Sequence, residues 1–263
     1  MRLGAALPIT GWEGAAIEAG HFARSAERLE KLGFASIWVF DAVGRGFILT
    51  DPLMALAVAA SATQRVELGT GVLQLPIRRT TELAHRIMTL HLVAGGRLLL
   101  GVGPGSTEAD FRAFGADYGT RMARFAEQLP RLRELLRSGR SGEVDLTPWP
   151  ATAGGPSVFY AAWRGAWIER AASEADGWVA SAMHNDDAAL ANGLARFRDA
   201  GGKRAVVTNV QVGHEVAPVL DRLAHLRELG FDDAVVLDLV PSEDRFAAIL
   251  DESDRVMERT RGE

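Results

Sequence analysis

Proton transfer in this chain would depend on few residue types, because several reactive ones are absent or scarce. There is no cysteine, which excludes disulfides, thiolate catalysis and cysteine-ligated metal. Lysine occurs only at Lys31 and Lys203, so a Schiff-base amine has almost no candidates. The histidines share no spacing that would bind a metal ion, and we expect no metal site.

A cluster of glycines marks the most unusual stretch, RLLLGVGPGS. An apolar run ends there in Gly101, Gly103 and Gly105, with Pro104 between the last two. Glycine is used where the backbone turns sharply or lets another molecule come close, and proline stiffens the bend. The stretch matches the dinucleotide fingerprint G-x-G-x-x-G poorly, because Ser106 occupies its third glycine position. The pattern therefore indicates a different binding position at the end of a strand.

The elements that would position these residues alternate between short apolar runs and longer segments with apolar spacing of three and four. The sequence contains eight such strand-then-helix units in order. That number, within about 250 residues, closes a (β/α)8 barrel. We predict an α/β fold, a (β/α)8 TIM barrel formed by residues 1–263 as a single domain, in which residues 138–156 are a surface loop. The expected strands are 3–10, 36–41, 66–76, 97–103, 157–163, 178–181, 204–213 and 232–240.

Two of the expected helices have recognisable starts. Asp51 precedes Pro52, which predicts an N-cap followed by proline at the first helical position. Thr107 and Asp110 have the spacing of a capping box.

Composition restricts the partners of the chain. The formal net charge of −5 argues against a nucleic-acid partner, because no large basic face is expected. No apolar run reaches the roughly 18 residues that a membrane span needs. The first residues, MRLGAALPIT, lack the pattern of a signal peptide, and we expect a cytoplasmic protein.

In a barrel of this kind the active site forms at the C-terminal ends of the strands. His184, after the sixth strand, is the best-placed imidazole for proton transfer. Asp41, after the second, could act as a base if burial raised its pKa, or could simply cap or form an ion pair. Arg45 could bind an anionic substrate, and Trp12, after the first strand, is a candidate substrate contact.

One long segment resembles a known family. Residues 68–115 are similar to the bacterial luciferase-like superfamily of flavin-dependent oxidoreductases, which use FMN or the deazaflavin F420. The segment EADGW at residues 174–178 fits the same family, so the resemblance covers nearly the whole chain and implies the same TIM barrel. The residues that carry it are Gly69, Thr70, Gly71, Thr89, Leu90, Gly95, Gly96, Arg97, Gly101, Gly103, Gly105, Phe111 and Gly115.

The resemblance implies where a cofactor would bind. The peptide joining Gly71 to Val72 would be the bulge or non-prolyl cis bond that supports the isoalloxazine ring. The phosphate would lie near the turn after the fifth strand, where Arg164 either contacts it or is a surface residue, and Arg124 is a second phosphate candidate. The full set implied is Thr70, Gly71, Val72, Gly103, Pro104, Gly105, Arg124, Ala161, Ala162, Trp163 and Arg164.

The chain departs from the family in two loops. Relatives commonly carry a hydroxyl-bearing turn after the fifth strand, whereas this chain has Trp163 and Arg164 there. Many relatives also carry a histidine after the second strand, and this chain has no histidine at that place. Phosphate binding would then depend on backbone N–H groups and arginine.

The resemblance implies a flavin-dependent oxidoreductase that acts on a small organic substrate. It would be a monooxygenase with reduced FMN, the favoured cofactor, or would transfer hydride with F420. Two alternatives stay open: a non-catalytic flavin-binding protein of the same fold, and a flavin-free lyase or isomerase that binds a sugar phosphate. The family also implies a homodimer, in which Met54, Leu56, Met88 and Leu92 could face the partner copy.

Overall fold

The computed structural model describes residues 1–47, 49–163 and 165–261, with side chains as far as residue 253. The strands are β1 (Arg2–Ala6), β2 (Ser36–Val39), β3 (Glu67–Thr70), β4 (Leu73–Gln74), β5 (Leu98–Gly103), β6 (Arg140–Ser141), β7 (Val144–Asp145), β8 (Ser157–Ala161), β9 (Gly177–Ser181), β10 (Ala205–Gln211) and β11 (Asp233–Leu237). The helices are α1 (His21–Leu32), α2 (Pro52–Ala62), α3 (Thr80–Val93), α4 (Glu108–Ala113), α5 (Arg121–Ser138), α6 (Trp167–Glu174), α7 (Asp187–Asp199), α8 (Ala217–Leu229) and α9 (Glu243–Arg261), with 3-10 turns η1 (Trp12–Gly14) and η2 (Pro150–Thr152).

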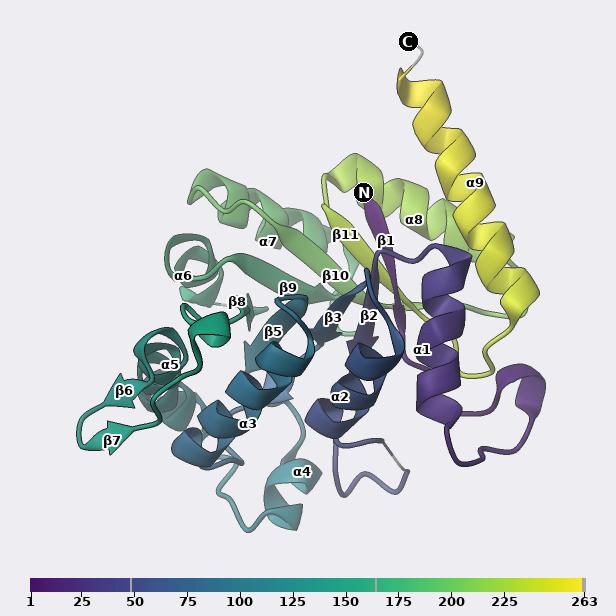
Figure 1. Cartoon of the computed structure of the whole chain (residues 1–263). Coiled ribbons are helices and arrows are strands. Elements are labelled where there is room, and N and C mark those ends of the chain that lie inside the picture. The colour runs from purple at the N-terminus through teal and green to yellow at the C-terminus, as the bar shows by residue number, and fades with distance from the viewer. Residues whose placement is uncertain (48, 164, 262–263) are drawn as a thin grey trace.

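The described strands form a closed ring, with the helices outside it (Figure 1). Eight strands, β1, β2, β3, β5, β8, β9, β10 and β11, pair in parallel, and the pairing of β3 with β5 closes the circle. The first and last of them are neighbours, with Leu3 opposite Ala234. The predicted (β/α)8 barrel is confirmed.

Helices α1 and α2 end and begin at residues that the sequence marks as helix boundaries. The Asp51 carboxylate accepts hydrogen bonds from the backbone N–H groups of Leu53 and Met54, at 3.0 and 2.9 Å, with Pro52 at the first turn. Helix α1 ends at Gly33, whose φ of 109° is a left-handed conformation that favours glycine. The N-cap predicted for α2 is therefore confirmed.

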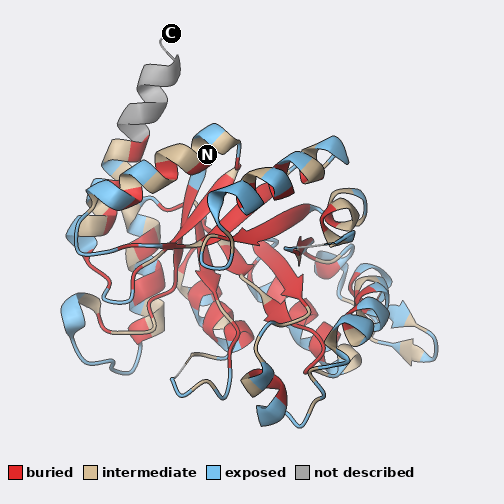
Figure 2. Ribbon diagram, turned by 180° about the vertical axis from the view of Figure 1, so that it is seen from behind, coloured by how far each residue is buried: buried red, intermediate tan, exposed pale blue. Residues whose placement is uncertain are grey.

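The strands of the ring are largely buried, whereas the helices around it also carry exposed residues (Figure 2). The larger apolar cluster lies between the strands and the helices, and a smaller one fills the inside of the ring around Trp38, Leu99 and Phe159. Gly69 makes room for the Trp38 indole, because a Cβ at position 69 would lie 2.4 Å from that ring. The inner cluster closes the barrel below its C-terminal end.

The expected surface loop at residues 138–156 contains more structure than its composition suggested. Strands β6 and β7 pair as a short antiparallel hairpin, followed by η2. The hairpin projects away from the ring beside α5 (Figure 1).

The N-terminal end of the ring is closed by ion pairs. Asp233, whose side chain is 1% exposed, pairs with Arg2 at 2.7 Å and with Arg204 at 2.8 Å. Glu67 pairs with the same two arginines at 2.5 and 2.7 Å. Among the described helices, none combines the length and apolar character that crossing a membrane requires.

Candidate active site

The C-terminal ends of the ring strands surround a cavity of about 690 Å³. Val72 and Ala161 line it from below, where they pack against the inner cluster of the barrel. Side chains from the loops after β1, β2, β8, β9 and β11 form its walls. Cavities that hold cofactors and small molecules typically measure about 300–1,000 Å³, so this one has the size of a ligand site.

The structure brings together about half of the residues that the sequence singled out. Those that line the cavity are Asp41, Arg45, Gly71, Val72, Gly105, Ala161, Trp163 and His184. Arg164 lies outside the described residues, so its predicted phosphate contact stays a prediction.

The connection between β3 and β4 has the geometry that the family resemblance implied. The peptide bond between Gly71 and Val72 is cis. A Cβ on Gly71 would lie 3.1 Å from the Phe40 ring and 3.4 Å from the Thr208 methyl group. The expected bulge or cis bond is confirmed, whereas its contact with a cofactor ring stays a prediction.

The glycines at the C-terminal end of β5 and just after it serve three separate purposes. A Cβ on Gly101 would lie 2.1 Å from the Thr70 carbonyl oxygen, so this glycine lets β3 approach β5. A Cβ on Gly103 would lie 2.8 Å from Val72. Gly105, with φ of 79°, lines the cavity and makes room for the Gln74 carboxamide oxygen, 2.4 Å from where a Cβ would stand. Of the three glycines, Gly105 alone is in the cavity wall.

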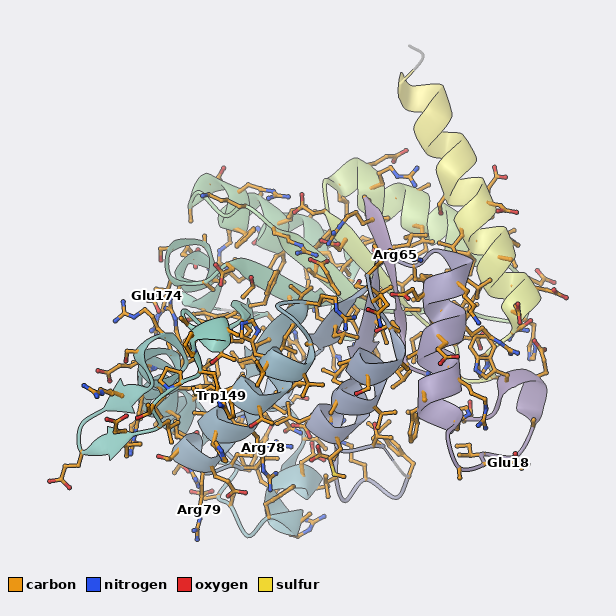
Figure 3. All side chains as sticks on the ribbon, in the orientation of Figure 1. Glu18, Arg65, Arg78, Arg79, Trp149 and Glu174 are labelled. Atoms are coloured by element: carbon orange, nitrogen blue, oxygen red, sulfur yellow. The ribbon has the colours of Figure 1, made fainter. Side chains whose placement is uncertain are left out.

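A network of charged side chains lies behind one wall. Arg78 pairs with both oxygens of Asp41, at 2.6 and 3.0 Å, and Arg45 pairs with both oxygens of Asp110, at 2.9 and 2.5 Å. Gln74 joins the two pairs, because its amide Nε2 donates to the Asp41 carbonyl and to Asp110 Oδ2. Arg78 lies at the end of the molecule where α4 is found (Figure 3). Each charge is therefore balanced within the protein.

The two carboxylates of this network have opposite pKa shifts. Burial raises the pKa of Asp41, and the Arg78 guanidinium and the Gln74 N–H offset only part of that effect. Burial also opposes ionisation of Asp110, but hydrogen bonds from Arg45, Gln74 and Val43 outweigh it and lower the pKa. Of the two roles considered for Asp41, the structure shows the ion pair, with the side chain 1% exposed.

These contacts bear on two predictions from the sequence. Arg45 lines the cavity with its guanidinium paired with Asp110, whose side chain is fully buried, and its contact with an anionic substrate stays a prediction. Thr107 and Asp110 do not form a capping box: Thr107 makes no side-chain cap bond, and the Asp110 carboxylate faces Arg45 and Val43 instead.

Gln74 presents an acceptor without a partner. Both of its amide N–H groups are used, which fixes the orientation of the carboxamide, and its Oε1 is buried with no hydrogen bond in the described structure. Gln74 lines the cavity, but this oxygen is itself buried against Gly105, where a Cβ would lie 2.4 Å from it. An unpaired buried acceptor is costly, and its position is fixed by the two hydrogen bonds of the amide group.

His184 stands at the end of a chain of hydrogen-bonded side chains. The Thr208 hydroxyl donates to the Ala180 carbonyl at 3.0 Å, so its oxygen accepts from Asn209 Nδ2 at 3.2 Å. Asn209 Nδ2 also donates to Ser181 Oγ at 3.2 Å, and Ser181 Oγ lies 3.1 Å from His184 Nδ1. With Ser181 as the donor to Nδ1, the neutral imidazole carries its proton on Nε2.

The His184 ring is held from one side by an indole. Trp163 stacks on it with ring centroids 4.6 Å apart and an interplanar angle of 18°. Burial lowers the pKa of His184, and the positive charge of Arg45 lowers it further. The lowered pKa favours the neutral imidazole, which lines the cavity and whose Nδ1 contacts Ser181.

A family model decides the relationship that the sequence suggested. The model of luciferase-like monooxygenases matches residues 1–255. The chain belongs to this family.

Individual relatives of this luciferase-like chain include oxygenases and F420-dependent enzymes. It is 35% identical over 125 residues to 4-hydroxyprotoasukamycin monooxygenase of Streptomyces nodosus subsp. asukaensis. The aligned segment covers 47% of this chain and 33% of that relative. The chain spans about half the length or less of the curated relatives that it matches in this way.

Solved structures share the fold. An F420-dependent secondary alcohol dehydrogenase with an F420–acetone adduct superimposes with a TM-score of 0.76 at 15% identity, covering 95% of this chain and 97% of that one. The oxygenating constituent of a Baeyer–Villiger monooxygenase from Pseudomonas putida, in complex with FMN, gives 0.66 at 15% identity, covering 88% and 80%. The fold thus accommodates FMN in one protein and F420 in another.

Several residues assigned by resemblance to the luciferase-like family lie beside the cavity rather than in its wall. Thr70 Oγ1 donates to the Gly101 carbonyl at 2.7 Å, and the Ala162 carbonyl accepts from Trp178 Nε1 at 2.8 Å. Gly103, Pro104 and Arg124 are also outside the lining.

The expected substrate contact of Trp12 is wrong. Its Nε1 donates to Ser25 Oγ at 2.9 Å, and its ring packs against Phe246 and under Arg28, away from the cavity of this luciferase-like barrel. The residue follows β1, but the chain turns outward there into η1.

The sequence placed Gln74, Ser181 and Asn209 among the candidates at the ends of strands but gave them no particular role, and it did not single out Thr208. Asn209 has a left-handed φ of 60° beside a register shift in β10, which turns its side chain toward Ser181. The available signal was the position of these residues at the C-terminal ends of strands. In the part of the chain that the structure describes, no group of three histidines or carboxylates could hold a metal ion.

Proposed function

We propose that this chain is an oxidoreductase that binds reduced FMN, or alternatively F420, in the cavity and acts there on a small organic substrate. Monooxygenation is the reaction we propose with FMN. The observation that carries the proposal is the cavity of about 690 Å³ at the C-terminal ends of the strands, with both residues of the cis peptide Gly71–Val72 in its lining.

The residues present fit a flavin or deazaflavin ring. Both ring systems are flat, and a cavity of about 690 Å³ is in the size range of sites that hold cofactors. Val72 and Ala161 offer small apolar side chains below the ring. Gly105 lines the cavity without adding a side chain. For the phosphate we retain the turn at residues 161–164 before α6, and Arg124, as proposed contacts.

When bound, the reduced ring supplies the electrons of the reaction. The protein holds the substrate and excludes water, since most of the lining is apolar. His184 is the proposed catalytic group, and its Nε2–H would donate to an oxygen atom of the substrate. Asp41 is proposed to position Gln74 and Arg78 rather than to take part in proton transfer, because its carboxylate is fully paired.

The experiment that tests the proposal is cofactor binding. Purified protein is titrated with FMN and, separately, with F420, and the absorbance change gives a dissociation constant for each. We expect FMN to bind at least about tenfold more tightly, a difference of about 1.4 kcal/mol. Failure of both to bind would contradict the proposal. If flavin binds but reduced flavin is never turned over with a panel of small organic substrates, the non-catalytic alternative is correct.

The Gln74→Leu variant tests whether this part of the cavity wall supports cofactor binding. The change removes the amide that donates to the Asp41 carbonyl and to Asp110, so we expect the dissociation constant for the cofactor to rise by about fivefold, or about 1 kcal/mol. Gln64→Leu, a change at an exposed residue, should leave the constant unchanged. A Gln74→Leu protein with a native circular dichroism spectrum and wild-type affinity would contradict a role of this wall in cofactor binding.

Three broader proposals accompany this one. We propose a single domain, supported by the pairing of the first ring strand with the last. We propose a cytoplasmic location, supported by the absence of cysteine from the chain. A homodimer through α2 and α3 is supported by Met54 and Leu92, which are 72% and 39% exposed. Leu56 and Met88 were expected at that interface, but they are buried inside the protomer and cannot contribute.

A further inference from the structure

We infer that the substrate of this site is an uncharged, largely hydrocarbon molecule. The inference depends on the proposed function. It concerns the part of the cavity that stays free for a substrate when a cofactor ring lies against Val72, Gly105 and Ala161.

The opening of the cavity is surrounded by apolar side chains that solvent can reach. Phe47, Met183 and Leu239 are 57%, 50% and 56% exposed, and all three line the cavity. They come from three different loops, after β2, β9 and β11. Isolated exposed apolar residues are normal, but several gathered at one opening indicate a site that binds apolar surface.

The inner wall opposite the proposed cofactor contacts is apolar as well. In the ring order, β1 lies across from β8 and β11 lies across from β5. Leu7, Ile9 and Leu237 line the cavity on the β1 and β11 side, and Leu49 extends the same surface from the loop before α2. Thr10, their polar neighbour, has its hydroxyl bonded to the Leu239 carbonyl at 2.7 Å.

The described part of the lining offers no unbalanced charge to an ionic substrate. Asp41 and Arg45 are the charged side chains in it, and each is held by a partner of opposite sign, Arg78 and Asp110. Burial and Arg45 lower the pKa of His184, which favours its neutral form. A carboxylate, phosphate or ammonium group would lose its hydration in this cavity without a counter-charge, which is unfavourable.

The test uses three probes with the same eight-carbon chain and different charge: 1-octanol, octanoate and octylamine. Each displaces the neutral dye Nile red from the full chain, with and without FMN or F420, and dye fluorescence gives the dissociation constants. We expect 1-octanol to bind at least about tenfold more tightly than either ion.

Variants at the opening separate binding in the cavity from binding elsewhere. Leu239→Asp and Phe47→Asp should each weaken 1-octanol binding by about tenfold, since each removes apolar contact worth about 1.4 kcal/mol. Ile17→Asp is the matched control, because Ile17 is 50% exposed but does not line the cavity, and it should leave the constant unchanged. Leu239→Lys should improve octanoate binding by adding the missing counter-charge.

The outcomes distinguish this inference from the proposed function. Octanoate or octylamine binding as tightly as 1-octanol would overturn the inference, whatever the cofactor result, because it would require an unpaired charge in the site. Equal effects of Ile17→Asp and Leu239→Asp would also overturn it. Loss of the proposed function would show instead as failure of FMN and F420 to bind while the preference for 1-octanol persists.

Discussion

At the scale of single residues, the decisive contact is the hydrogen bond between Ser181 Oγ and His184 Nδ1, which favours the Nε2–H tautomer when Ser181 is the donor. The Ser181→Ala substitution removes this hydroxyl. We expect the Nε2–H form to lose its preference, and turnover to fall by about fivefold for one lost hydrogen bond of about 1 kcal/mol. Nitrogen chemical shifts of the His184 ring measure the tautomer directly.

A control for that variant is available on α2. Ser61 is exposed and its hydroxyl bonds to the Ala57 carbonyl, so Ser61→Ala should change neither the tautomer nor turnover. If Ser181→Ala keeps the wild-type ring shifts, the hydrogen-bond chain does not set the tautomer.

Gly105 gives a second prediction at this scale. It has φ of 79°, and a Cβ there would lie 2.4 Å from Gln74 Oε1. Gly105→Ala should lower the free energy of unfolding by about 1–2 kcal/mol, the cost of a left-handed conformation for a residue with a side chain. It should also weaken cofactor binding, because Gln74 must move.

Gly213→Ala is the matched control in urea unfolding. A Cβ on Gly213 would meet no described atom within 4 Å, so we expect no loss of stability there. Equal stability of the two variants would show that position 105 tolerates a side chain.

At the scale of elements, Asp110 ties α4 to the loop after β2. Its carboxylate accepts from Arg45 and from the Val43 N–H, which lowers its pKa even though burial acts in the opposite direction. A lowered folded-state pKa stabilises the protein above the ordinary value of 3.8, and this contribution is lost as the pH falls below it. Asp110→Asn should therefore be less stable than the wild type at pH 7, with a difference that shrinks in acid.

Urea unfolding between pH 7 and pH 3 measures that difference. Asp221→Asn, at an exposed position of α8, is the control and should stay close to the wild type in stability at pH 7. A stability difference for Asp110→Asn that stayed constant down to pH 3 would be inconsistent with the lowered pKa.

Elements were more predictable from the sequence than the contacts between them. Periodicity and local caps such as Asp51 depend on neighbours in the chain, so the order of strands and helices and the barrel were predictable. Asp110 was misassigned to a cap because its partner Arg45 is 65 residues away, which no local pattern reports. Leu56 and Met88 were expected at a surface for the same reason: the sequence does not show which apolar face of a helix meets the barrel.

At the scale of the whole molecule, closure of the ring depends on its first and last strands meeting. Arg2 of β1 and Arg204, before β10, both pair with Asp233 at the start of β11, and the Asp233 side chain is 1% exposed. Asp233→Ala would leave two guanidinium groups without this partner. Removing one member of a buried ion pair typically costs about 3–5 kcal/mol, and because both arginines also pair with Glu67, we expect about 3 kcal/mol.

Guanidinium chloride would screen these charges, so urea unfolding is the suitable measurement for Asp233→Ala. The control is Asp145→Ala in the β6–β7 hairpin, where the carboxylate pairs with Arg140 and the two side chains are 44% and 73% exposed. Exposed pairs contribute about 0–1 kcal/mol, so this variant should stay close to the wild type. If the two variants lost equal stability, the ion pairs at the base would not hold the first and last strands together, and closure would depend on the backbone pairing of β1 with β11 and on the apolar core between strands and helices.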